Sequence, residues 1–419
     1  MIPNWRVPMI RGLLCGLMIV FLSHQAHSAK PITGEQIHQT LSGNSLKRRQ
    51  QLLDQLMYVE TLDGRQSSAL AEFVAISLRE ENQLTGPDLQ ALYLLQRADD
   101  SSHVSTFENG LSHVDPRAVQ LSLDGLARLK PDAVFDKLPQ LTQHQAYKSS
   151  YGFRRAVIET VAAYGAESSI EFLIDQLPSL DGQLEYLTVL HLQRLTGQVF
   201  TNSADDWKKW WSSVGPDDRG PPTEQQQKQI AQQKLIGQWN GAVPEFFDMP
   251  LFAKKIVFII DNSASMKSTL EGEMRIERAQ KELSEAIEKM APDVQFNIIA
   301  FNHRIETWQR SLQPANSSAK AAAVQYGYAL APFGKTASYD ALSLGLSFDP
   351  NTELVVFLSD GKPTAGTIVE PLIILQAIWK QNLFQRTSIH TLGIDTRDET
   401  EEFMEYLAEQ NYGMYTKIR

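Results

Sequence analysis

Five side chains with oxygen donors stand in three short segments of the C-terminal part of the sequence. Asp261, Ser263 and Ser265 form a DxSxS pattern, Thr336 ends a GKT triplet, and Asp360 is the centre of an SDG triplet. Carboxylate and hydroxyl oxygens are hard metal ligands, and no His or Cys occurs in these segments. Such a set would suit Mg²⁺, Mn²⁺ or Ca²⁺ rather than zinc or copper.

The elements around these segments alternate between strands and helices. Residues 256–260 (IVFII) are continuously apolar, which is typical of a central parallel strand buried on both faces. Apolar residues at helical spacing predict a helix over 275–290. Further strands are predicted over 294–301, 304–308, 354–358, 388–394 and 413–418. This alternation predicts a doubly wound, Rossmann-like α/β domain, whose ligands bind at the carboxyl ends of the strands.

The order and strand context of these residues resemble the von Willebrand factor A (VWA) domain and its metal-ion-dependent adhesion site. All five positions of that site are filled, by Asp261, Ser263, Ser265, Thr336 and Asp360. The resemblance implies that the three hydroxyls bind the metal directly and that the two aspartates hold it partly through water. It implies Mg²⁺ as the ion, with Mn²⁺ or Ca²⁺ as alternatives. The competing interpretation is that these residues only cap helices and turns.

The resemblance also implies a binding function. Neutral hydroxyl ligands would leave the ion short of negative charge, so that an Asp or Glu of a partner protein could complete its coordination. We therefore expect an exported scaffold for protein–protein interaction and adhesion, with no catalytic or cofactor-binding residues. One alternative is an accessory subunit of an enzyme complex, as VWA domains are in chelatases and with some ATPases. Another is a hydrolase that uses the metal as a Lewis acid.

Other catalytic patterns are missing from the sequence. The GKT triplet lacks the earlier glycine of a P-loop, because position 329 is alanine. No GxSxG or HExxH pattern is present. The sequence therefore favours a binding protein over an enzyme.

Residues 1–28 resemble a secretory signal peptide. Arg6 and Arg11 precede an apolar run over 12–22, and the small residues Ala26 and Ser28 follow it. An uncleaved membrane anchor is the alternative, but the run is too short to span a bilayer. Export to the periplasm or the medium is expected, with no membrane span after cleavage. Cleavage would also remove Cys15, the one cysteine, so no disulfide is expected.

The charge balance excludes some partners. The formal net charge is −10, and loss of Arg6 and Arg11 would leave 37 basic and 49 acidic residues, or −12. No basic block stands out, so nucleic acid is not an expected partner.

Residues 30–214 carry an all-helical pattern with an internal repeat. A segment over 117–139 recurs over 155–178, at an offset of 38 or 39 residues, which is the length of a HEAT-type helix pair. A generic helical bundle is the alternative. Trp207, Trp210 and Trp211 share one helical face and are expected to seal the end of this array, or to form a sugar-binding platform. A Pro/Gly/Gln-rich linker is predicted over 215–249, followed by the VWA domain over 250–419.

Overall fold

The computed structural model describes residues 32–98, 100–215, 222–232, 239, 241 and 243–419. The predicted signal peptide lies outside the described residues. The described chain divides into two compact units, residues 32–169 and Ile170–Arg419. Within the described ranges, no helix is both long and apolar enough to cross a membrane.

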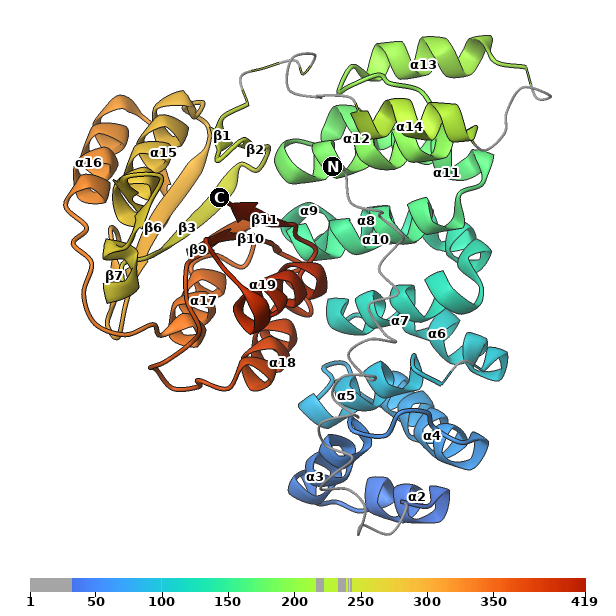
Figure 1. Ribbon diagram of the computed structural model, residues 1–419. Helices are drawn as coiled ribbons and strands as arrows, with labels where there is room; N and C mark the ends of the chain where they lie inside the picture. The colour runs from blue at the N-terminus through green and yellow to red at the C-terminus, as the bar shows by residue number, and fades with distance from the viewer. Residues whose placement is uncertain (1–31, 99, 216–221, 233–238, 240, 242) are drawn as a thin grey trace. The chain divides into compact units, whose positions relative to one another are not determined.

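The first unit consists of helices that pack against helices close to them in the sequence (Figure 1). Its helices are α2 (Gly34–Ser42), α3 (Leu46–Leu56), α4 (Gly64–Glu80), α5 (Gly86–Leu95), α6 (Val104–Gly110), α7 (Pro116–Leu129), α8 (Leu138–Gln143), α9 (Gln145–Ser149) and α10 (Tyr151–Tyr164), with the 3₁₀ turns η1 (Ser101–His103) and η2 (Pro131–Lys137). In this unit α5 packs against α7, and α7 packs against α10. The all-helical prediction for this region is confirmed.

Polar caps explain where these helices begin. The side chains of Thr33, Asp63 and Ser150 each accept a hydrogen bond from the backbone N–H three residues later, which satisfies a donor that the helix leaves free. Helix α10 ends at Gly165, whose φ of 71° is left-handed and closes the helix at little steric cost. The second repeat copy, over 155–178, therefore contains a helix end.

The described part of the second unit begins with four helices and one 3₁₀ turn. These are α11 (Glu167–Gln176), which crosses the boundary between the units, η3 (Leu177–Ser179), α12 (Gly182–Thr196), α13 (Ala204–Ser213) and α14 (Glu224–Gln232). Trp207 of α13 is fully buried, and its indole N–H donates to the carbonyl of Thr201 at 2.8 Å. Its ring meets the rings of Phe200 and Trp210 edge to face. Since a buried indole is not available for stacking on a sugar, this residue has the packing role.

A seven-stranded sheet forms the centre of the C-terminal region, in the order β11-β10-β9-β3-β6-β7, with β8 also paired to β6. The strands are β3 (Lys255–Asp261), β6 (Gln295–Phe301), β7 (Ile305–Thr307), β8 (Gln313–Pro314), β9 (Leu354–Ser359), β10 (Ser388–Ile394) and β11 (Tyr415–Ile418). Neighbours among β3, β6, β9, β10 and β11 are parallel, while β7 and β8 are antiparallel to β6. The predicted α/β class with a mostly parallel sheet is confirmed.

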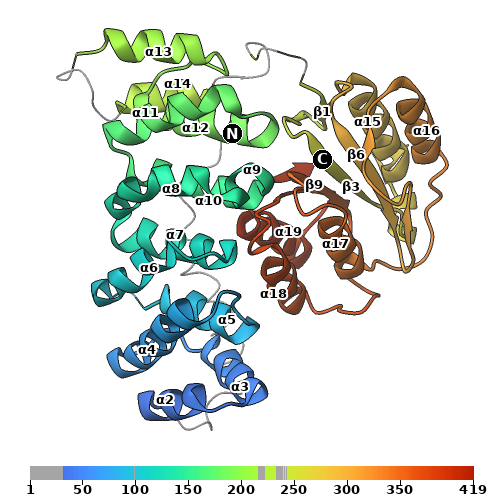
Figure 2. The same cartoon turned by 180° about the vertical axis from the view of Figure 1, so that it is seen from behind.

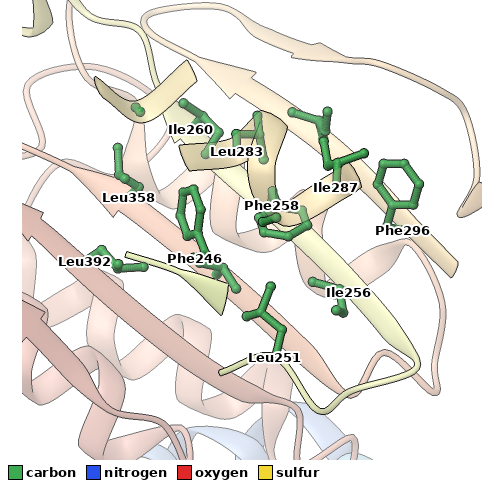
Figure 3. Packing of buried hydrophobic residues seen from close by; sticks show 14 of the residues in the cluster. Phe246, Leu251, Ile256, Phe258, Ile260, Leu283, Ile287, Phe296, Leu358 and Leu392 are labelled. Carbon is green, nitrogen blue, oxygen red and sulfur yellow. The ribbon is translucent and has the colours of Figure 1, made fainter. Parts of the chain in front are cut away.

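Helices cover both faces of this sheet (Figures 1 and 2). They are α15 (Arg275–Lys289), α16 (Ser317–Tyr328), α17 (Ser338–Ser347), α18 (Pro371–Asn382) and α19 (Asp398–Gln410). Ile256, Phe258 and Ile260 of β3 pack with α15 and α16 (Figure 3), and Val257 and Ile259 pack with the other three helices. Each such buried side chain contributes about 1.5–3 kcal/mol. The alternation explains why the strand is apolar throughout.

Two short hairpins accompany the sheet, β1 (Glu245–Phe246) with β2 (Met249–Pro250), and β4 (Thr269–Leu270) with β5 (Glu273–Met274). Phe246 is fully buried and meets Phe258 edge to face. The segment predicted as a linker thus contains helix α14 and part of a hairpin that packs into the core of the sheet domain.

A buried carboxylate joins α12 to the beginning of the sheet. Glu353 accepts hydrogen bonds from the backbone N–H of Gln183 at 2.9 Å and of Lys254 at 3.1 Å. Close by, the rings of Tyr186 and Phe252 stack with centroids 4.0 Å apart. Burial raises the pKa of Glu353 to about 7, and the charge of Asp181 adds to this, while the two hydrogen bonds and the Lys254 charge oppose it.

We expect Glu353→Gln to change the pH dependence of stability. The unfolded chain would release this proton near pH 4.5 and the folded chain near 7, so the contribution of Glu353 is present in acid and is lost as the pH rises through 7. At pH 8 the free energy of unfolding of the variant should exceed that of the parent by roughly 1–3 kcal/mol, which raises its unfolding temperature. Near pH 4.5 the two proteins should match. Thermal unfolding at both pH values checks this, with the exposed Glu288→Gln as control; a difference independent of pH would contradict it.

Candidate metal centre

The two aspartates of the predicted site follow neighbouring parallel strands. Asp261 is the last residue of β3, and Asp360 follows the last residue of β9, which pairs with β3. The Asp261 carboxylate is fixed by two donors: Ser359 Oγ donates to Oδ2 at 2.5 Å, and the backbone N–H of Ser263 donates to Oδ1 at 2.7 Å. Its orientation is therefore set by both strands.

The two serines connect one aspartate segment to the other. Ser263 Oγ and Ser265 Oγ lie 3.0 Å apart, and Ser265 Oγ donates to Asp360 Oδ1 at 2.7 Å. Ser265 lies in the 3₁₀ turn η6 (Ala264–Lys267). Ser265 is exposed, whereas Ser263 is buried. The hydroxyls thus form a chain that leads from the buried end of β3 towards solvent.

Backbone hydrogen bonds bring the loop of Thr336 to the same place. The N–H of Phe333 donates to the carbonyl of Asn262 at 2.8 Å, and the N–H of Ala264 donates to the carbonyl of Gly334 at 3.1 Å. Thr336 and Thr364 exchange two further hydrogen bonds, of 2.9 and 3.0 Å, on the other side. The loop is therefore held between the segments that follow β3 and β9.

The hydroxyls of Thr336 and Ser265 both lie close to Gly361. A Cβ placed on Gly361 would lie 3.8 Å from Ser265 Oγ and 3.9 Å from Thr336 Oγ1. Thr336 is buried, and its hydroxyl makes no hydrogen bond to any residue of the described ranges. The structure thus brings all five predicted residues together at the carboxyl edge of the sheet.

The donor set fits a hard divalent cation. Three hydroxyls and two carboxylates converge, and these are the oxygen donors that a hard divalent cation prefers. No group of three or more His, Cys, Asp or Glu residues that could hold a metal occurs in the described part of the chain. A candidate centre must therefore count hydroxyls among its ligands, as this one does.

Burial makes it costly to keep the carboxylates of the site ionised. It raises the pKa of Asp261 to about 7, and the negative charge of Asp360 acts in the same direction, while hydrogen bonds from Ser359 and Ser263 oppose the rise. The Asp360 side chain is fully buried too, and it pairs with Arg275 at 2.6 Å. A proton would compete with a cation for Asp261, so cation binding should weaken as the pH falls below 7.

Three further residues contribute to this centre and were not predicted from the sequence. Ser359 orients Asp261, Arg275 pairs with Asp360, and Asp395 pairs with the other side of the Arg275 guanidinium. Ser359 stood within the SDG triplet, and its position at a strand end was the available signal. Arg275 and Asp395 gave no such signal, because their contacts depend on the order of the strands.

Gly334 sets the path of the Thr336 loop. Its φ is +76°, and a Cβ there would lie 2.0 Å from Nδ1 of His303. Gly272 offers a comparison, since its φ is +93° but nothing lies within 4 Å of its Cβ position. An alanine at either position would strain the backbone, but only an alanine at position 334 would also clash with a neighbouring side chain.

We expect Gly334→Ala to displace the loop and to weaken Mg²⁺ binding at least tenfold. Gly334→Ala should also destabilise the domain by about 1–3 kcal/mol. Gly272→Ala should be destabilised only by the backbone strain of an alanine with a positive φ, and its Mg²⁺ affinity should be unchanged. Calorimetric Mg²⁺ titration and thermal unfolding of both variants check this. Equal Mg²⁺ affinities in the two variants would show that the loop position does not matter to the site.

Comparison with known proteins identifies the family of the sheet domain. A family model of the von Willebrand factor type A domain matches residues 254–417. Inter-alpha-trypsin inhibitor heavy chain H2 is 31% identical over 195 residues in Sus scrofa and 28% identical over 195 residues in Homo sapiens, covering 43% of this chain in each case. This chain covers only 20% of the length of either relative.

Among solved structures, a von Willebrand factor type A protein from Catenulispora acidiphila is 20% identical with a TM-score of 0.35, covering 41% of this chain and 40% of its own. The family match and the sheet described above lead to one conclusion. Residues 254–417 are a von Willebrand factor type A domain, and an all-helical region precedes it.

Proposed function

We propose that this protein binds a partner protein through a divalent cation held by Asp261, Ser263, Ser265, Thr336 and Asp360. Mg²⁺ is the ion that we expect, with Mn²⁺ or Ca²⁺ as alternatives. The observation that carries the proposal is the unbroken contact from Ser263 through Ser265 to Asp360, with the Thr336 hydroxyl beside it. Von Willebrand factor type A domains typically bind proteins, which supports the same class of function.

The residues divide their roles by burial. Asp261 is wholly buried and held by two donors, so it would act as a fixed negative charge beneath the ion. Ser265 is exposed, so the side of the site that it forms is open to a partner. When bound, the cation would supply a coordination position for a carboxylate oxygen of an Asp or Glu. Exposed Lys335, beside Thr336, would favour an acidic partner at short range.

The proposal extends to the whole chain. Residues 1–28 have the pattern of an export signal, so we place the protein in the periplasm or outside the cell. The HEAT-like repeat and the packing of each helix against its sequence neighbours support a scaffold role for the helical region. We propose binding rather than catalysis, because the sequence lacks the nucleophile patterns of hydrolases.

A pull-down with the full chain without residues 1–28 tests this function. We expect a protein from the exported fraction to be retained in Mg²⁺ and lost in EDTA. Ser263→Ala/Ser265→Ala should lose it in both conditions, because two hydroxyl ligands are removed. Mass spectrometry of the retained proteins and calorimetric Mg²⁺ titration provide the measurements.

The matched control is Ser317→Ala/Ser318→Ala, which removes two exposed hydroxyls at the start of α16. This control should retain the partner as the parent does. A partner held equally in Mg²⁺, in EDTA and by the Ser263→Ala/Ser265→Ala variant would reject metal-dependent binding and assign the interaction to another surface.

A further inference from the structure

A single arginine joins the candidate metal centre to a third aspartate. Arg275 is the first residue of α15, and its Nη1 pairs with Asp360 Oδ2 at 2.6 Å. Its Nη2 pairs with Asp395, which follows the last residue of β10. The Arg275 side chain is only 13% exposed, and that of Asp360 is 0% exposed. The guanidinium therefore bridges the ends of two neighbouring strands in a largely dry environment.

Both oxygens of Asp360 are occupied by donors. Oδ1 accepts from Ser265 and Oδ2 accepts from Arg275. The Arg275 charge offsets the Asp360 charge that the centre would offer to a cation. Because charges that are shielded from solvent interact more strongly than exposed ones, a buried guanidinium at this distance must repel a cation bound to the same carboxylate.

Asp395 acts in the opposite sense. Its carboxylate shares the Arg275 guanidinium with Asp360, and it also receives Arg397 at 3.3 Å. A negative charge on this side draws the guanidinium away from Asp360 and reduces the positive potential at the centre. The affinity of the centre for a cation would thus depend on how closely the Arg275 guanidinium approaches Asp360 relative to Asp395.

We propose that Arg275 is a positioning residue that lowers the intrinsic cation affinity of this centre and that Asp395 partly restores it. The inference rests on the proposed function. With a weakened intrinsic affinity, the cation would be held most firmly when a partner carboxylate adds its own negative charge.

Calorimetric Mg²⁺ titration of the full chain tests the inference, because two substitutions should change the Mg²⁺ affinity in opposite directions. We expect Arg275→Gln to tighten Mg²⁺ binding about tenfold or more, because a repelling charge is removed. Asp395→Asn should weaken it about threefold or more, because Arg275 is then left to Asp360 alone. Arg275→Lys keeps the charge and should stay within about threefold of the parent.

Arg278→Gln is the matched control, since it removes an arginine of the same helix that contacts Glu271 at 3.9 Å and the carbonyl of Arg419 at 3.1 Å rather than Asp360. It should leave the Mg²⁺ affinity unchanged. Weaker binding by both Arg275→Gln and Asp395→Asn would mean that the bridge only holds Asp360 in place, and would overturn the inference.

The failures of the two proposals are distinguishable. A parent chain that binds no Mg²⁺ would reject the metal-dependent function itself, and this inference with it. A parent that binds Mg²⁺, with Arg275→Gln no tighter, would reject only the role of Arg275. If Arg275→Gln does not fold, as thermal unfolding would reveal, Asp395→Asn still tests the inference, because an unchanged or tighter Mg²⁺ affinity in that variant excludes it.

Discussion

The carboxylate of Asp261 is completely buried at the end of a strand that is itself covered on both faces. An isolated charge in such a place would cost several kcal/mol, so the neighbouring structure must supply donors and counter-charge. Ser359 can supply one donor only because β9 lies beside β3, and the N–H of Ser263 supplies another only because the chain turns directly after the strand. The position of the strands and the shape of the first loop are thus tied to one side chain.

The same constraint extends to the second aspartate. Asp360 is buried next to Asp261, and their mutual repulsion is part of what raises the pKa of Asp261. Arg275 and Ser265 both donate to Asp360, so each aspartate has its own pair of donors. The donors around each carboxylate lower the cost of placing two like charges this close, and the proposed divalent cation would lower it further.

The sheet could be predicted from the sequence because burial on both faces leaves a direct signal. The apolar run over 256–260 became β3 (Lys255–Asp261), and the helix predicted over 275–290 became α15 (Arg275–Lys289). The two hairpins and β8 were missed, since strands of two residues carry no period. The contact of Gln183 with Glu353 was also beyond sequence reasoning, because these residues are 170 positions apart and no pattern relates them.

The candidate site divides in the same way. Asp261 and Asp360 were predictable because each follows a buried strand, and parallel strands place such residues at one edge. The roles of Arg275 and Asp395 were not, because they depend on β10 lying next to β9. Strand order results from packing across the whole sheet, so a single segment does not encode it.

Net charge and local charge act on different scales in this protein. At −10 overall, the chain would repel an acidic partner at a distance, although salt screens such forces beyond about 8–10 Å. At the site itself, Arg275 and Lys335 place positive charge beside neutral hydroxyls. Association with such a partner would therefore be slow, because no long-range electrostatic attraction would guide it to the site. The specificity of the proposed binding would come from the geometry of the site rather than from the electrostatic field of the whole molecule.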